Sequence, residues 1–248
     1  MTDILGYRKK IAVLVPSTNT VVEPETHMMS VPGVTAHTSR IRMHSGDLSN
    51  DAAADRFHTN ALAEVKDAMD SVLTSQPDYV VMGISAPTFI GGKKGSAETK
   101  QRLLDLTRGR GVAIGSEACA QALHAFRVKR ISILSPYQPA MDEDVRTFFT
   151  DWGFDVVKLK GLRIASAVAI AHVTESEIRE SLAEIDSPRV QALVQVGTNL
   201  AFVKLADQLE RELGKPVIAI NAATWWTALR ELGIPDKIHG CGALLREH

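Results

Sequence analysis

The sequence predicts an α/β protein made of two similar doubly wound (flavodoxin-like) lobes. Three observations lead to this fold class: short β-branched runs alternate with helical patterns, the order of these elements repeats once along the chain, and equivalent strands end in proline- or glycine-bearing turns. Repetition at such a long period is typical of a duplicated supersecondary unit. We therefore expect lobes related by a pseudo-two-fold axis, with an active-site cleft between them. The alternative is that the repeat reflects only the general likeness of βαβ units.

The first half of the chain alternates apolar strands with amphipathic helices. The pattern predicts strands at residues 11–15, 34–43, 79–84 and 112–114, and helices at 52–73, 97–106 and 117–126. The longest of these helices carries a continuous apolar face, made by Phe57, Ala61, Val65, Met69 and Val72.

The second half repeats the order of the first. Residues 130–137 copy the first strand and its proline-bearing loop, and further strands are predicted at 155–159, 193–196 and 217–220. Helices are predicted at 141–152, 175–185, 203–213 and 223–232. Thr174 and Glu177 form a capping-box pattern at the start of one helix, and Gly214 ends the next.

The repeat also predicts where the lobes meet. We expect residues 1–112 to form the first lobe and residues 113–216 the second, with the segment 217–248 packing back onto the first. A chain of 248 residues is long enough for two such cores.

Composition narrows the function classes. The net charge of −1 gives no electrostatic basis for binding nucleic acid or an anionic membrane. No apolar run approaches the roughly 20 residues of a membrane-spanning helix, and the N-terminus lacks a signal-peptide pattern. Two cysteines without metal-ligand spacing favour a reduced, cytoplasmic protein. Nucleotide-binding glycine motifs are absent and the eight histidines are scattered, so we expect neither a cofactor nor a metal.

Two glycine turns are the first candidate walls of a site. The turn at residues 83–92 follows a buried strand, and the turn at 197–200 follows the equivalent strand of the second half. In open α/β sheets, ligands bind outside the carboxyl ends of the strands. Gly83 and Gly197 would allow the backbone to approach a ligand closely. The residues that follow could donate hydrogen bonds to a developing enolate or carboxylate oxygen, or could satisfy only the turns themselves; they are Ser85, Thr198 and Asn199.

The two proline-bearing loops are the second candidate walls. The first carries four short polar side chains that could anchor a carboxylate, or could cap a helix: Ser17, Thr18, Asn19 and Thr20. In the second loop, Tyr137 could donate a hydrogen bond or move a proton, or be a rim aromatic. A free phenol has a pKa near 10, so its role need not be acid–base chemistry.

Few other side chains offer chemistry. Cys119 lies inside a predicted helix between alanines, where a buried small hydrophobe is expected. Cys241, in a Gly-Cys-Gly loop, is the better reactive candidate. Glu23 and Glu25 could be acids or the solvated start of a helix. One of the two tryptophans at 225–226 should wall the pocket or pack in the core.

Four segments together resemble one enzyme group. Residues 15–20, 82–89, 135–137 and 240–245 resemble, in order and spacing, the maleate isomerase and arylmalonate decarboxylase group of the aspartate/glutamate racemase superfamily. The resemblance covers nearly the whole chain. It implies that Asn19 holds a substrate carboxylate and that Tyr137 contacts substrate. Segment 82–89 is more similar to the dioxyanion loop of the decarboxylases.

The departures from that group matter as much. The resemblance implies one cysteine at each of two pseudo-symmetric strand ends in racemases and isomerases, and only the second in decarboxylases. Here Gly83 occupies the first position and our alignment puts Gly197 at the second. Ala167 stands where the isomerases carry an asparagine.

With both thiols absent, the resemblance favours a cofactor-independent lyase. We expect decarboxylase-type C–C cleavage of a small carboxylic or dicarboxylic acid through an enolate-like intermediate. Open alternatives are a maleate isomerase-like enzyme with a relocated nucleophile, a hydrolase using an activated water, and a non-catalytic small-acid binding protein. A homodimer or higher homo-oligomer is also open.

Overall fold

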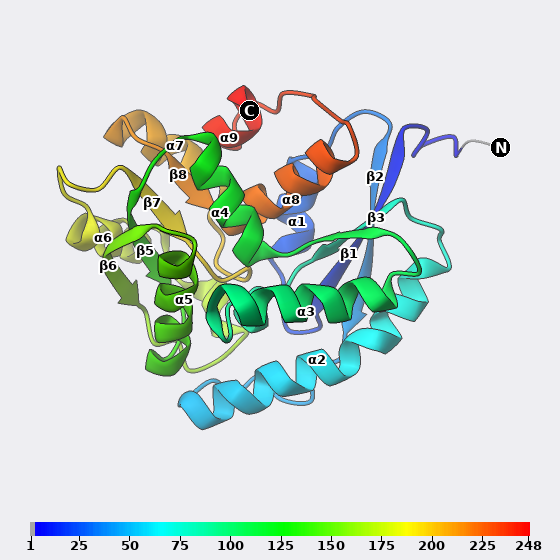
Figure 1. Ribbon diagram of the computed structural model, residues 1–248, viewed down its shortest axis with the longest axis horizontal. Coiled ribbons are helices and arrows are strands. Elements are labelled where there is room, and N and C mark those ends of the chain that lie inside the picture. Colours follow the sequence, from blue (N-terminus) through cyan, green and yellow to red (C-terminus); the bar gives the residue numbers. More distant parts are fainter. Residues whose placement is uncertain (1–2) are drawn as a thin grey trace.

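Two four-stranded parallel sheets form the framework of the protein (Figure 1). The computed structural model describes residues 3–248. The first sheet has the order β2(Val34–Ile41), β1(Lys9–Pro16), β3(Tyr79–Met82), β4(Gly111–Ala113). The second has the order β6(Asp155–Gly161), β5(Arg130–Ser135), β7(Ala192–Gln195), β8(Val217–Ala219). Because the two orders are the same, the predicted two-lobe α/β fold is confirmed, and each sheet has the switch point of a doubly wound fold beside its central strands.

The helices cover both faces of each sheet. They are α1(Val22–Met28), α2(Asp51–Leu73), α3(Gly92–Leu106), α4(Gly115–Ala125), α5(Pro139–Asp151), α6(Glu175–Ile185), α7(Val203–Leu213), α8(Ile220–Glu231) and α9(Ala243–Glu247), with 3-10 turns η1(Ala86–Thr88) and η2(Ala169–His172). Sequence periodicity did not predict α1 or α9, and α3 begins at Gly92 rather than at residue 97. The predicted capping box of α6 is present, with Thr174 accepting from the Glu177 N–H.

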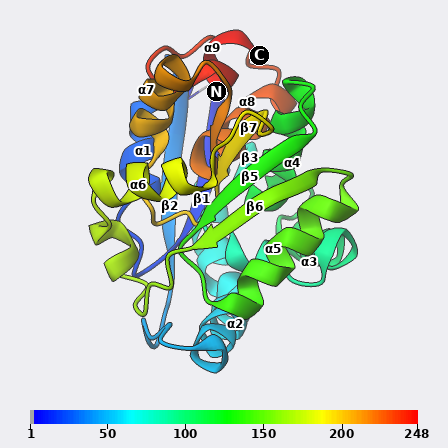
Figure 2. The same ribbon diagram turned by 90° about the vertical axis from the view of Figure 1, so that its left-hand side faces the viewer.

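The two lobes exchange one helix each. Buried side chains of α2 and α3 pack on one face of the first sheet, and those of α1 and α8 contribute to the core on its other face. The second sheet has α4 and α5 on one face and α6 and α7 on the other (Figures 1 and 2). Thus α4, which follows the last strand of the first sheet, covers the second sheet, and α8 does the reverse. This exchange ties the lobes together.

The predicted boundaries of the two lobes stay a prediction. Strand pairing shows which sheet the start of the segment 217–248 joins. β8 pairs with β7 of the second sheet, so the start of the segment 217–248 does not belong to the first lobe. The rest of the segment behaves differently, because α8 contacts β3 and β4 of the first sheet. The chain order of elements could not reveal that a strand and the helix after it would separate in this way.

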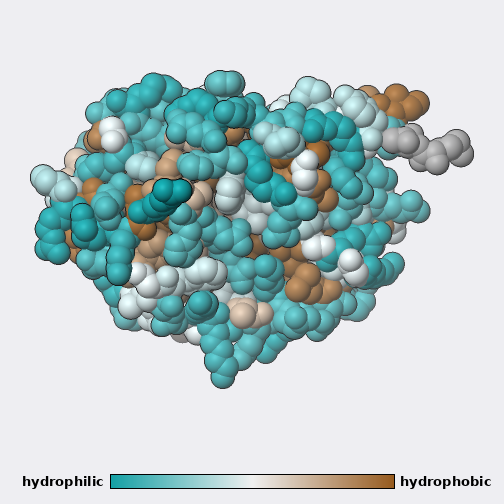
Figure 3. Space-filling view, turned by 45° about the horizontal axis from the view of Figure 1, so that its top comes forward, coloured by the Kyte–Doolittle hydropathy of each residue, from teal (hydrophilic) through white to brown (hydrophobic). Residues whose placement is uncertain are grey.

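The face drawn in Figure 3 is mostly hydrophilic, with hydrophobic side chains in scattered groups. Across residues 3–248, no helix is both long and apolar enough to cross a membrane.

Candidate active site

A cavity lies where the carboxyl ends of four central strands meet between the lobes. Loops after β1 and β3 of the first sheet and after β5 and β7 of the second contribute to its lining, and the cavity is partly open to solvent. Its polar side chains come mainly from these loops: Thr18, Asn19, Ser85, Tyr137, Gln138, Thr198 and Asn199. The structure therefore brings together most of the side chains that the sequence singled out.

Tyr137 and Ser85 face each other across the lobe boundary. Their hydroxyl oxygens are 2.9 Å apart, and both residues are buried. Burial raises the pKa of Tyr137, and the hydrogen bond to Ser85 only partly offsets this, so the phenol is neutral at pH 7. A neutral phenol can donate a hydrogen bond to a carboxylate or enolate oxygen.

The Tyr137 loop is held by a buried network. The Tyr137 N–H donates to Ser135 Oγ at 3.2 Å, and Arg163 donates to the Tyr137 carbonyl at 2.6 Å. Asp142 accepts from both the Ser135 hydroxyl and Arg163. These contacts hold the backbone of Tyr137, and its hydroxyl is held by Ser85.

Side-chain hydrogen bonds connect the two lobes at the cavity, and they come from Asn19, Thr198 and Asn199. The Thr198 hydroxyl donates to the Gly83 carbonyl at 2.9 Å, and Asn19 Nδ2 donates to Thr198 Oγ1 at 3.3 Å. Asn199 accepts from the Thr20 N–H and donates to the Ala167 carbonyl. Asn19 Oδ1 also accepts from two N–H groups at the start of α1. These side chains line the cavity, but much of their hydrogen-bonding capacity already serves the protein; one hydrogen of the Asn19 amide has no such use in residues 3–248.

Backbone donors face the same region from both lobes. In the described chain, the N–H groups of Ile84 and Ser85, and of Gly197 and Thr198, donate to no protein acceptor, and all four residues line the cavity. The register of β3 and β7 against β1 and β5 makes these two pairs equivalent. Unused N–H groups of this kind can bind a carboxylate or stabilise an oxyanion.

The two glycines are not equivalent positions, which corrects our alignment by one residue. Gly83 N donates to Leu14 O in the first lobe, and Val196 N donates to Leu134 O in the second. Leu14 and Leu134 hold the same register against β3 and β7, so Val196 is the counterpart of Gly83.

The prediction that both glycines face the cavity is also wrong in part. Gly83 does not line it, and a Cβ there would lie 2.7 Å from Leu14 O. Gly197 does line the cavity, with φ at +101°, and a Cβ there would lie 2.5 Å from the Pro136 ring. Gly197 is therefore glycine because the turn requires it.

Two residues of the first loop lie outside the cavity. Ser17 is exposed, and its hydroxyl accepts from the Met43 N–H; Thr20 is also exposed. Nothing in their position suggests contact with a ligand in the cavity.

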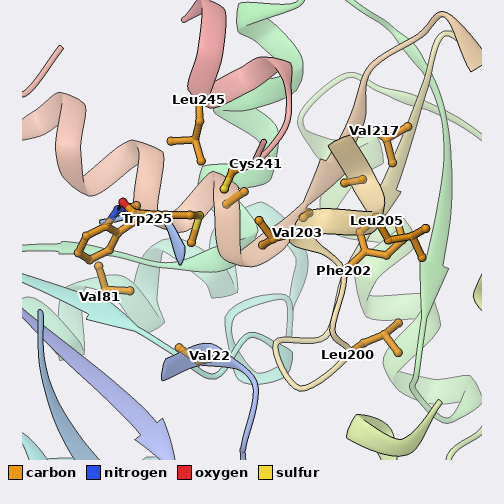
Figure 4. Close-up of a cluster of buried hydrophobic side chains, with 14 of the residues drawn as sticks. Val22, Val81, Leu200, Phe202, Val203, Leu205, Val217, Trp225, Cys241 and Leu245 are labelled. Carbon is orange, nitrogen blue, oxygen red and sulfur yellow. Dashed lines mark hydrogen bonds between the residues drawn. The ribbon is translucent and has the colours of Figure 1, made fainter. Parts of the chain in front are cut away.

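Neither cysteine lines the cavity. Cys119 is fully buried in α4, where burial raises the pKa of its thiol. Cys241 lies in the core near Val203 and Leu245 (Figure 4), and burial raises its pKa as well. Both thiols are therefore protonated at pH 7 and away from any ligand.

The remaining candidates serve the fold. Glu23 pairs with Arg40 at the surface. Glu25 is buried and accepts from the Phe202 and Val203 N–H groups at the start of α7, and burial raises its pKa. Trp225 donates to the Met29 carbonyl in the core.

The sequence analysis missed His58, on α2. The residue lines the cavity and is 5% exposed, and burial lowers the pKa of its imidazole to about 4. The other residues that line this part of the cavity are apolar: Leu48, Ala54, Phe57, Met141, Ile164 and Ile170. A histidine on the buried side of a predicted amphipathic helix was the available signal, but periodicity cannot tell a core-facing position from a cavity-facing one.

Two loops close over this wall. The Leu48 N–H donates to the Ala165 carbonyl at 2.9 Å, and the Ala167 N–H donates to the Gly46 carbonyl at 2.8 Å. One loop follows the edge strand β2 and the other follows the edge strand β6. Both lobes therefore contribute to the cover of the apolar wall. Gln138 donates to the Leu48 carbonyl beneath it.

The protein is thus a two-lobed α/β protein with a donor-lined cavity at the strand ends. The sequence model of the arylmalonate decarboxylase family matches residues 12–245, so the chain belongs to that family. This confirms the predicted resemblance.

Curated relatives are similar over nearly their whole length. The maleate isomerase of Nocardia farcinica is 25% identical, with 96% of each chain covered. The maleate isomerase of Pseudomonas putida is 27% identical, covering 95% of this chain and 96% of its own.

Solved structures share the fold. A cysteine-to-serine variant of the Nocardia farcinica maleate cis-trans isomerase, with a covalently bound succinylcysteine intermediate, has a TM-score of 0.86 at 22% identity, covering 97% of this chain and 99% of its own. A liganded double variant of arylmalonate decarboxylase has a TM-score of 0.81 at 19% identity, covering 97% of this chain and 100% of its own.

Proposed function

We propose that the chain is a cofactor-independent decarboxylase that removes CO₂ from a substituted malonate-type dicarboxylic acid. One observation carries the proposal: neutral hydrogen-bond donors occupy one part of the cavity, apolar side chains occupy another, and in residues 3–248 no Lys, Arg, Asp or Glu lines it.

The division of the cavity suits loss of CO₂. One carboxylate accepts hydrogen bonds from Tyr137, Ser85 and the free N–H groups of the turns. The second carboxylate then lies in the apolar part, where fewer hydrogen-bond donors solvate its charge than in the donor-lined part. Its departure as uncharged CO₂ removes that charge and leaves the electron pair on the α-carbon. The donors stabilise the enediolate that forms, because they already point at the oxygen atoms on which the charge grows.

A maleate isomerase is the second candidate, supported by the whole-length similarity to the curated isomerases. One solved relative, the Nocardia farcinica maleate cis-trans isomerase variant, carries a covalently bound succinylcysteine intermediate. A covalent thiol step of that kind would need a cysteine at the cavity, and Cys119 and Cys241 both lie elsewhere. This favours the decarboxylase proposal.

The test is product analysis in D₂O. The protein is incubated with phenylmalonate, methylmalonate, hydroxymalonate and maleate, and ¹H NMR follows the products. Decarboxylation yields a monocarboxylic acid with one deuterium on the α-carbon, and isomerisation yields fumarate. We expect monocarboxylic acid from at least one malonate, and a much lower rate with the Tyr137→Phe variant. Fumarate from maleate without product from any malonate would overturn the proposal in favour of the isomerase, and binding without product would indicate a non-catalytic protein.

A further inference from the structure

Decarboxylation in this cavity requires a source for one proton. When the C–C bond breaks, its electron pair stays on the α-carbon, which must then bind a proton to complete the product. Among the described residues that line the cavity, only Tyr137 and His58 can exchange a proton through a titratable side chain. The inference drawn here rests on the proposed function, because it concerns the proton of that same reaction.

In the proposed reaction, the Tyr137 hydroxyl donates its hydrogen bond to an oxygen atom of the enediolate. Its hydroxyl pairs with Ser85 at 2.9 Å, beside the unused N–H groups of the glycine turns. A donor in this place is needed for the enediolate throughout the reaction. Giving up its proton would leave a buried phenolate next to a negative intermediate, and burial already raises the pKa of Tyr137.

His58 lies on a different wall and has no partner. It stands on α2, next to Ala54 and Phe57, whereas the donors come from the strand ends. The residue is 5% exposed, and within residues 3–248 neither ring nitrogen has a hydrogen-bond partner from another residue, although neither nitrogen is fully enclosed. A ring nitrogen that is accessible and has no protein partner, on a residue that lines the cavity, is available to bind a ligand.

The charges around His58 also fit a proton carrier. Burial lowers the pKa of His58 to about 4, and the negative charge of Asp55 on the same helix offsets this only in part. The phenol of Tyr137, which shares the cavity, is neutral. Among residues 3–248, no Lys or Arg lines the cavity, so His58 is the side chain of this lining that can become cationic beside an entering dicarboxylate. Two negative charges nearby favour the protonated ring, so ligand entry raises the pKa of His58.

We propose that His58 is the proton donor of the reaction: its imidazole takes a proton from solvent as the dicarboxylate enters, and gives it to the α-carbon after CO₂ has left. The α-carbon–carboxylate bond breaks and its electron pair remains as the enediolate. One ring N–H bond of the imidazolium then breaks as the new C–H bond forms. Dicarboxylate plus one proton becomes monocarboxylate plus CO₂, and His58 returns to its neutral state.

The kinetic test uses a His58→Ala variant and a malonate with two different α-substituents. A single positioned donor delivers its proton to one face, so the wild-type protein yields mainly one enantiomer. With His58→Ala, the rate is expected to fall at least about a hundredfold, the usual contribution of a general acid, and the product to become racemic. Added imidazole, which fits the vacated space, should restore part of the rate. The control is His44→Ala, which removes an exposed histidine paired with Glu64 and should change neither rate nor enantiomer ratio.

A second measurement does not depend on turnover or on a variant that folds. In wild-type protein with ¹⁵N-labelled histidine, the His58 ring nitrogens report its protonation at pH 7. Malonate is the probe, and its addition is expected to convert the neutral ring into imidazolium. A ring that stays neutral at saturating malonate would overturn the inference. So would a His58→Ala protein with wild-type rate and one enantiomer. A wild-type protein that releases no CO₂ from any malonate instead refutes the proposed function, and the NMR result then decides separately whether His58 takes a proton beside a bound dicarboxylate.

Discussion

The two lobes share one framework and contribute unequally to the site. Both sheets have the same strand order, and the turns after β3 and β7 offer equivalent N–H pairs. The loops after β1 and β5 differ. Ser17 and Tyr137 each follow the proline after the equivalent strand, yet Ser17 is exposed and Tyr137 lies in the cavity. Both lobes therefore offer backbone donors at equivalent positions, whereas only the second provides a phenol.

The helices repeat this contrast from the opposite side. α2 has 23 residues and reaches the cavity with Ala54, Phe57 and His58, whereas its counterpart α6 has 11 and contributes none of the lining. Inverting a carbon centre requires one acid–base group on each face. In the proposed mechanism, the second-lobe phenol donates to a substrate oxygen, and His58 alone on the other wall exchanges a proton. The comparison therefore argues against racemisation and for chemistry with one proton delivery.

The largest expected effect separates the two proline loops. Tyr137→Phe removes one donor to the developing oxyanion, so kcat/KM on the acid that the protein turns over should fall about a hundredfold to a thousandfold. Ser17→Ala changes the equivalent position of the first lobe and should alter kcat/KM by less than about threefold. Steady-state kinetics on both variants checks this. Equal losses would mean that the lobes contribute alike.

The next effect concerns the His58 wall. Because burial lowers the folded-state pKa of His58 from 6.5 to about 4, the unfolded chain binds more protons between these values. Its contribution to stability is present above about pH 6.5 and is lost as the pH falls toward 4. Between about pH 7 and pH 4.5, wild type should lose about 2–3 kcal/mol more of its free energy of unfolding than His58→Gln.

Urea unfolding at the two pH values measures that difference. Buried carboxyl groups with raised pKa values, such as Glu25 and Glu210, titrate in both proteins and cancel. The same pH dependence in wild type and variant would show that His58 is not held neutral by burial.

The third effect tests the glycine turn that only the second lobe has. Gly197→Ala places a methyl group against the Pro136 ring at a φ of +101°. Gly214→Ala also meets a positive φ, +64°, but finds open space. Gly197→Ala should therefore lose about 2 kcal/mol more of the free energy of unfolding, from strain and overpacking. Thermal and urea unfolding of both variants gives this value, and equal losses would contradict the tight contact with Pro136.

Much of this framework was readable from the sequence. β-branched runs predicted the strands, and the repeated proline and glycine turns predicted which strand ends meet. What failed has physical causes. α1 is short and is capped from inside the site by Asn19, so it has little periodic signal of its own. The exchange of α4 and α8 depends on which sheet their apolar faces cover, and the order of elements carries no record of that.

The sequence predicted which loops form the site. It did not predict which residues of the two glycine turns are equivalent, or which helix residues line the cavity. Two glycines after apolar strands looked equivalent, but Gly83 matches Val196, and spacing alone cannot detect a slip of one residue. His58 was not predicted, because the hydrophobic periodicity of a buried helix face is the same whether that face packs on the core or lines a cavity. The predictions failed at the positions that form the cavity, where the chain departs from the regular alternation of strands and amphipathic helices.

The smallest expected effect concerns the two thiols, and it decides between the chemistries of the relatives. Cys119→Ala and Cys241→Ala should each leave kcat within about threefold of wild type, because neither sulfur lines the cavity and burial raises both pKa values. Stability should fall by about 1 kcal/mol, the cost of a small core truncation. Iodoacetamide should react slowly with the folded protein, and a carboxylate such as malonate should not change that rate. If either variant folds normally yet loses more than about a hundredfold in kcat, a thiol takes part in the reaction. The decarboxylase proposal, with His58 as its proton donor, would then yield to a covalent isomerase mechanism.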